Sequence, residues 1–208
     1  GALVLRQTHL DNDAFGPNAF FSNLDGSLAP LIVTPAGGSR LAVNADMIRN
    51  PFDQRHYMFM DGRGVRKEAI RLLLPVDFTS GWRNTVIPVA LAEAGFPMET
   101  EEDFARALNA HAVILFHQAN GRMCADLAKR LKRFGFRGSC PSNIARYANT
   151  TSASWILLLY ELWRRGKLKS LRRRPKRIRV VVFGGGFTAI LAFFDWTLEV
   201  PEGYPFPA

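Results

Sequence analysis

Residues 111–120 read HAVILFHQAN, an apolar run that gives way at once to polar side chains. A short apolar run of this kind is typical of a strand buried on both faces of a sheet. We therefore predict a strand over residues 111–116, with His117 at its carboxyl end. Layered α/β proteins place functional side chains at the carboxyl ends of strands. A histidine there can equally be a structural residue held by hydrogen bonds, so both roles stay open for His117.

Helical and strand patterns alternate on both sides of this stretch. The spacing of apolar residues predicts helices over 65–74, 82–94, 121–134 and 150–165. Strands are predicted over 1–5, 178–183 and 187–196 from their apolar and β-branched residues. This order predicts a layered α/β fold in which helices cover a buried sheet.

Two further loops carry candidate functional residues. Residues 146–154 read RYANTTSAS and lead into a predicted helix, so Asn149 is either a helix cap or a functional amide. Residues 183–188 read FGGGFT between two predicted strands. The three glycines either form a tight turn or let backbone N–H groups approach a substrate oxygen.

The amino-acid composition limits the kinds of partner and the setting that we expect for the protein. The net charge of +9 predicts an acidic partner. The basic run over 168–179 has no interleaved aromatic residues, so we favour a solvated loop over a nucleic-acid site. No apolar stretch is long enough to span a membrane. Cys124 and Cys140 have no metal-type spacing and are too few for a disulfide framework, so we expect a reducing, cytoplasmic setting and no metal.

Taken in order, HQAN, RYANTTSAS and FGGGFT resemble the C-terminal half of the β-ketoacyl-acyl-carrier-protein synthase III family. The resemblance extends upstream to YMFMDGRGV at 57–65, DGS at 25–27 and GALVL at 1–5. It implies the thiolase-like layered α/β/α/β/α fold of two similar halves. This chain then supplies the C-terminal half and the last strands of the N-terminal half. The implied parts are 1–55, the end of the N-terminal half with a connecting loop, 56–196, the C-terminal half, and 197–208, a C-terminal extension.

The resemblance also implies a reaction, a decarboxylative condensation of an acyl thioester with a malonyl-type thioester on a Cys–His–Asn triad. His117 and Asn149 match the two donors that bind the malonyl thioester oxygen. Gly185 matches the backbone donor of the second oxyanion hole, and Phe187 is expected to shape the pocket floor. One departure is Ala148, which stands where the family usually has glycine.

No bound cofactor is implied, because the substrates are carried on coenzyme A or on the phosphopantetheine of an acidic acyl carrier protein. The cations expected at the docking face are Lys67, Arg122, Lys129 and Arg130, with Arg63 and Arg66 near them in sequence. For each of these cations a solvated helix face is the alternative interpretation.

Neither Cys124 nor Cys140 matches the family's nucleophilic cysteine. We therefore expect a separate, Cys-bearing N-terminal half, either a cleaved segment or another subunit, within a dimer of thiolase-fold units. Two alternatives are a non-decarboxylating acyltransferase on the same fold and a non-catalytic partner subunit. The presence of both His117 and Asn149 favours the decarboxylative ketosynthase.

Overall fold

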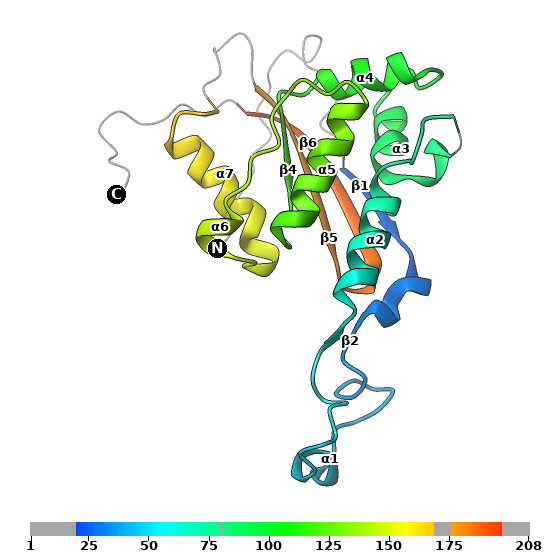
Figure 1. Ribbon diagram of the computed structural model, residues 1–208, viewed down its shortest axis with the longest axis vertical. Helices are drawn as coiled ribbons and strands as arrows, with labels where there is room; N and C mark the ends of the chain where they lie inside the picture. Colours follow the sequence, from blue (N-terminus) through cyan, green and yellow to red (C-terminus); the bar gives the residue numbers. More distant parts are fainter. Residues whose placement is uncertain (1–19, 80, 169–175, 197–208) are drawn as a thin grey trace.

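The computed structural model describes residues 20–79, 81–168 and 176–196. Its centre is a four-stranded mixed sheet in the order β1-β6-β5-β4 (Figure 1). These strands are β1 (Phe20–Leu24), β4 (Val113–Phe116), β5 (Lys176–Gly184) and β6 (Thr188–Trp196). β4 runs parallel to β5, whereas β6 is antiparallel to both β5 and β1. The predicted strand over 111–116 and the two strands around the glycines are thus confirmed.

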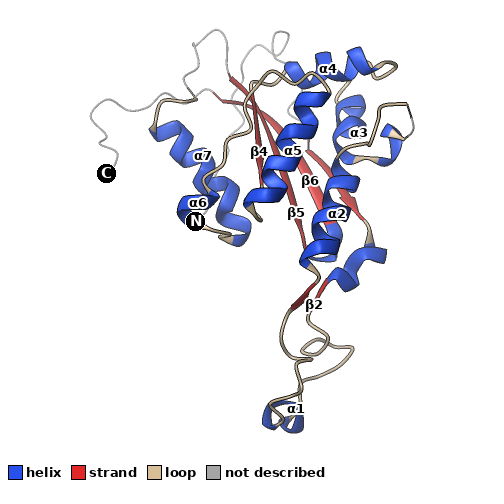
Figure 2. Cartoon of the chain, in the orientation of Figure 1, coloured by secondary structure: helices blue, strands red, loops and turns tan. Residues whose placement is uncertain are grey.

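Helices cover both faces of this sheet (Figure 2). One face packs against α2 (Gly62–Leu73), α3 (Val86–Glu93), α4 (Glu101–Asn109) and α5 (Gly121–Arg133). The other face packs against α7 (Ser154–Arg164). All four residues of β4 are buried, because alternate side chains enter the two cores: Ile114 and Phe116 lie in one, Val113 and Leu115 in the other.

Local capping explains where several helices begin. The side chain of Asp61 accepts hydrogen bonds from the first turn of α2, and that of Asn120 accepts one from Met123 N at the start of α5. α4, which the apolar spacing did not predict, begins at a capping box formed by Thr100 and Asp103. The predicted helix over 150–165 is divided into a 3₁₀ turn, Thr151–Ala153, followed by α7. A further short helix, α6 (Ile144–Tyr147), lies in the preceding loop.

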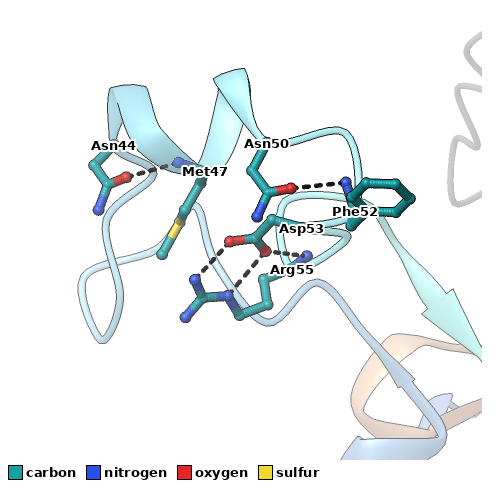
Figure 3. A network of polar contacts seen from close by, with 6 residues as sticks. All are labelled: Asn44, Met47, Asn50, Phe52, Asp53 and Arg55. Carbon is teal, nitrogen blue, oxygen red and sulfur yellow. Dashed lines mark hydrogen bonds and ion pairs between the residues drawn. The ribbon is translucent and has the colours of Figure 1, made fainter.

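Residues 32–61 form an excursion that extends from the body of the molecule (Figure 1). It leaves and returns through the short pair β2 (Ile32–Val33) and β3 (Phe59–Met60), and it contains α1 (Ala45–Arg49). Asn44 and Asn50 accept backbone hydrogen bonds within it, and Asp53 pairs with Arg55 (Figure 3). These contacts brace a loop that buries Met47 but exposes Ile48 and Phe52.

Several predictions fall outside the described residues: the strand over 1–5, most of the basic run over 168–179 and the extension over 197–208. Among the helices of the described ranges, none has the length and apolar character needed to cross a membrane.

Candidate active site

The carboxyl ends of β4 and β5 meet at His117. Its backbone N–H donates to the carbonyl of Val181 at 2.9 Å, which continues the β4–β5 ladder by one residue. Its half-buried ring packs edge-on against Phe183, with ring centroids 5.3 Å apart. His117 therefore follows β4 directly, as predicted, and lies beside β5, the strand that leads into the glycine turn.

Ser154, the first residue of α7, contacts this histidine directly. Its Oγ lies 2.6 Å from Nδ1 of His117 and accepts the backbone N–H of Gln118 at 3.0 Å. The sequence interpretation did not single out Ser154, although it closes the RYANTTSAS segment. A serine that opens an apolar helix gives no local signal that it contacts a side chain 37 residues away.

His117 is neutral at physiological pH. Burial lowers its pKa from the ordinary value, because desolvation disfavours the charged imidazolium. A neutral imidazole has one N–H donor and one acceptor nitrogen. The ring can therefore donate a hydrogen bond to a substrate from one nitrogen only.

Gln118 connects the end of β4 to the loop before α6. Its fully buried side chain donates from Nε2 to the carbonyl of Phe116 at 2.8 Å. Its Oε1 accepts from Ser142 Oγ at 2.6 Å and from the backbone N–H of Asn143 at 3.3 Å. The end of β4 and the loop before α6 are therefore joined into one unit by the hydrogen bonds of Gln118.

The same unit extends to α7 through Glu161. This buried carboxylate accepts from Asn143 Nδ2 at 2.9 Å and pairs with Arg146 at 3.6 Å and Arg165 at 2.5 Å. The loop that precedes Asn149 is thus anchored to α7 by its polar side chains.

Asn149 is exposed on this loop. Its Oδ1 accepts the backbone N–H of Thr151 at 2.9 Å. A backbone N–H can only donate, so the amide oxygen is the engaged atom, and within the described residues the Nδ2 hydrogens are left for another acceptor. The bond to Thr151 fits a local capping role, and the available Nδ2 fits a functional amide, so both interpretations of Asn149 have a physical basis here.

Backbone strain is concentrated around this site. Within the described residues, the non-glycine residues with positive φ are Ala148 at 56°, Thr151 at 53° and Phe187 at 52°. Such conformations are unfavourable for residues with a Cβ and persist only where the surroundings impose them. Two flank Asn149 and the third ends the glycine turn.

The glycine turn joins β5 to β6. Gly184 and Gly185 are exposed, and a Cβ built on either meets nothing within 4 Å. The described residues therefore leave open space above the Gly185 backbone, as close approach by a ligand requires. Phe187 is buried in the core beneath the turn, and its carbonyl accepts the backbone N–H of Asp25 at 3.2 Å.

A pocket of about 450 Å³ lies between the beginnings of α2 and α5. Its lining residues are Gly62, Arg63, Arg66, Asn120, Gly121 and Arg122. Of the four predicted docking cations, Arg122 lines it. Lys67 and Lys129 are exposed elsewhere on the two helices, and Arg130 donates to the carbonyl of Leu74 at 3.4 Å. Arg66, mentioned only as a neighbour in sequence, lines the pocket while paired with Asp126.

Both cysteines are free thiols held in the protonated form. Burial raises the pKa of Cys124, whose Sγ lies 3.7 Å from the carbonyl of His117, and raises that of Cys140 to about 12. Since a nucleophilic cysteine needs a lowered pKa, neither thiol has the environment of a nucleophile.

Comparison with known proteins shows what the chain is similar to. Residues 107–196 match the family model described as 3-Oxoacyl-[acyl-carrier-protein (ACP)] synthase III C terminal. The chain is 32% identical to Beta-ketoacyl-[acyl-carrier-protein] synthase III of Chlamydia muridarum over 79% of its own length and 41% of that protein. It is 29% identical to the protein of the same name from Roseiflexus castenholzii, over 95% and 50% respectively. The chain thus spans half or less of these relatives.

Solved structures show the same fold. A 3-oxoacyl-(acyl-carrier-protein) synthase III structure superposes with a TM-score of 0.60 at 22% identity, covering 91% of this chain and 50% of that one. The synthase III structure from Pseudomonas aeruginosa gives 0.58 at 26% identity, covering 88% and 45%. The chain is therefore a thiolase-fold protein. Within that fold it is similar to the β-ketoacyl-acyl-carrier-protein synthase III proteins and resembles their C-terminal half.

Proposed function

We propose that this chain supplies the decarboxylation site of a ketosynthase that condenses an acyl thioester with a malonyl-type thioester. The observation that carries the proposal is the state of two side chains. Asn149 has its amide oxygen engaged by Thr151, and the neutral ring of His117 has its Nδ1 engaged by Ser154. Within the described residues this leaves the Nδ2 hydrogens of Asn149 and the Nε2 of His117 for a substrate oxygen, to which the ring donates when its proton is on Nε2.

In the proposed reaction, a cysteine thiolate first attacks the acyl thioester: a new S–C bond forms to the cysteine, the C–S bond to the carrier breaks, and the carrier leaves as its thiolate. The carbonyl oxygen of the malonyl thioester then accepts hydrogen bonds from His117 and Asn149. Loss of CO₂ leaves an enolate, whose negative oxygen these donors stabilise. The enolate carbon attacks the acyl carbonyl, forming the new C–C bond, and the C–S bond to the cysteine breaks to return the thiolate. One such donor contributes about 2.7–4 kcal/mol to transition-state stabilisation.

Gly185 has a distinct role in this scheme. Its backbone N–H would polarise the acyl carbonyl held on the cysteine, where the space above the turn admits the acyl group. Phe187, which is buried beneath the turn, would support the turn and shape the pocket floor.

We assign the nucleophile to another polypeptide segment, because the buried Cys124 and the partly buried Cys140 both have raised pKa values. That segment would be the Cys-bearing half of a thiolase-fold unit, and the working enzyme a cytoplasmic dimer of such units. The pocket lined by Arg63, Arg66 and Arg122 is suited to the phosphates of coenzyme A or of a carrier-protein phosphopantetheine arm. The acyl carrier protein in the name of its relatives is our proposed partner.

The test uses the chain co-purified with its Cys-bearing partner, supplied with an acyl donor and carboxyl-labelled malonyl carrier protein. We expect release of labelled CO₂ matched by the condensation product. His117→Ala and Asn149→Ala should abolish CO₂ release while mass spectrometry still finds the partner cysteine acylated. Transfer of the acyl group to an acceptor without CO₂ release would instead support a non-decarboxylating acyltransferase. No turnover with the intact chain, despite an acylated partner, would support a non-catalytic subunit.

A further inference from the structure

The hydroxyl of Ser154 has two hydrogen-bond partners in the site, and together they determine which ring nitrogen of His117 carries the proton. The residue is 2% exposed, so solvent does not compete for its hydroxyl. The hydroxyl lies between the backbone N–H of Gln118, at 3.0 Å, and Nδ1 of His117, at 2.6 Å. Both partners come from the end of β4, whereas Ser154 comes from the first turn of α7.

The direction of each hydrogen bond follows from the hydrogens available. The Gln118 N–H can only donate, so it uses one lone pair of Ser154 Oγ. The hydroxyl proton then needs an acceptor, and Nδ1 of His117 is the acceptor that the described residues offer it. Ser154 therefore donates to Nδ1, and the proton of the neutral ring is placed on Nε2.

The opposite arrangement has a cost. If Nδ1–H donated to Ser154, the hydroxyl proton would have no acceptor within the described part of this buried site, at a cost of about 1–3 kcal/mol. The tautomer with its proton on Nδ1 would also present the lone pair of Nε2 to a substrate. A lone pair repels an enolate oxygen, whereas an N–H stabilises it.

We infer that Ser154 is a positioning residue that holds His117 in the Nε2–H tautomer, so that the ring is a hydrogen-bond donor toward the substrate. This inference deepens the proposed function and rests on it for its catalytic consequence. The tautomer itself is a property of the chain that can be measured without substrate.

The first experiment records nitrogen–proton correlation spectra of the full chain with ¹⁵N-labelled histidine, and assigns the His117 signals with a His117→Gln variant. In the wild type we expect Nδ1 to show the shift of an unprotonated ring nitrogen and Nε2 that of a protonated one. In Ser154→Ala we expect a mixture of tautomers or a reversal. Ser154→Thr restores a hydroxyl and should restore the wild-type pattern.

Ser142→Ala is the matched control. It removes a hydrogen bond of the same length, 2.6 Å, from the same hydrogen-bonded unit. The lost bond is the one to Gln118 Oε1, and it does not involve His117. If its His117 spectrum changed as much as that of Ser154→Ala, general loosening of the unit would explain the effect and the inference would fail. A wild-type ring protonated at Nδ1 would overturn it outright, even if Ser154→Ala proved too unstable to study.

The second experiment measures kinetics in the complex with the Cys-bearing partner. Ser154→Ala should lower kcat for CO₂ release by about 10–100-fold with KM within about twofold, because the lost interaction acts on the transition state. Full kcat in Ser154→Ala with an altered tautomer would overturn the positioning role. The predicted tautomer without any CO₂ release by the wild type would overturn the proposed ketosynthase activity and leave the assignment of Ser154 standing.

Discussion

The guanidinium of Arg179 donates from Nη2 to Nδ1 of His111 at 2.8 Å, inside the core beside β5. Arg179 is fully buried and His111 is 5% exposed. Phe193 lies under the guanidinium carbon at 5.1 Å and beside the imidazole, with ring centroids 5.3 Å apart. Two basic groups thus share one aromatic-walled site, and the charge of Arg179 makes the charged state of His111 less favourable.

This pair predicts a loss of stability in mild acid. Burial, and then the charge of Arg179, lower the pKa of His111 from 6.5 to about 3. Between these values the unfolded chain binds a proton that the folded chain does not, so the free energy of unfolding falls as pH is lowered from about 6.5 toward 3. The contribution of His111 to that fall is up to about 5 kcal/mol.

Thermal unfolding at pH values between 7 and 4 measures this contribution. His111→Gln keeps an oxygen acceptor for Arg179 but cannot titrate, so we expect its Tm to depend less on pH than that of the wild type. Equal pH dependence in the two proteins would show that other groups govern the acid transition.

Replacing Arg179 should stabilise the protein. Its Nε and Nη1 have no hydrogen-bond partner within the described residues, and burial lowers its pKa from 12.5 to about 9. A buried charge of this kind destabilises the fold relative to an apolar side chain of similar volume. We expect Arg179→Met to raise the free energy of unfolding by about 1–4 kcal/mol.

Denaturant unfolding of Arg179→Met and of Arg177→Met tests this expectation. Arg177 also lies on β5 but is partly exposed and pairs with Asp195 at 3.7 Å, so its replacement should not stabilise. A destabilised Arg179→Met would mean that a counter-charge compensates the guanidinium in solution.

Ala148 provides a prediction about backbone strain. Its φ of 56° and ψ of −158° lie in a region that glycine adopts easily and alanine does not. Ala148→Gly should therefore stabilise the chain by about 1 kcal/mol, after allowing for the greater entropy of glycine in the unfolded state. Ala153→Gly is the control: with φ −76° and ψ −12° it has no strain to relieve, so the same change should destabilise. Differential scanning calorimetry of both variants decides the matter, and a lower Tm for Ala148→Gly would contradict the strain.

The basic pocket predicts which cations bind the carrier-linked substrate. Arg122 lines the pocket, whereas Lys129 is exposed seven residues along α5, a rise of about 10 Å. We expect Arg122→Glu to raise KM about tenfold at low salt, and less at high salt, with little change in kcat. Lys129→Glu has the same change of charge and should have a much smaller effect. Equal effects would point to long-range attraction by the whole basic face.

Sequence patterns drew attention to His117 because an apolar strand pattern stops there, and to Asn149 because an apolar helix pattern begins just after it. They did not reveal α4, whose start is marked by Thr100 and Asp103 rather than by the more familiar Glu at the third position. Helical periodicity placed Lys129 and Arg130 on α5 but could not show which end of that helix faces a pocket. That depends on α2, whose Leu74 carbonyl engages Arg130. Ser154 was missed for the same reason, since its role exists only once α7 packs against β4.

α2 and α5 run side by side in the same direction and are tied together at two levels. Near the pocket Arg66 pairs with Asp126, and at the far end Arg130 reaches the Leu74 carbonyl. Two ties between parallel helices resist both sliding and spreading. The separation of the first turns of the two helices, and with it the width of the pocket between Arg63 and Arg122, therefore depends on contacts made by Arg66 and Arg130, two cations that do not themselves face each other across that pocket.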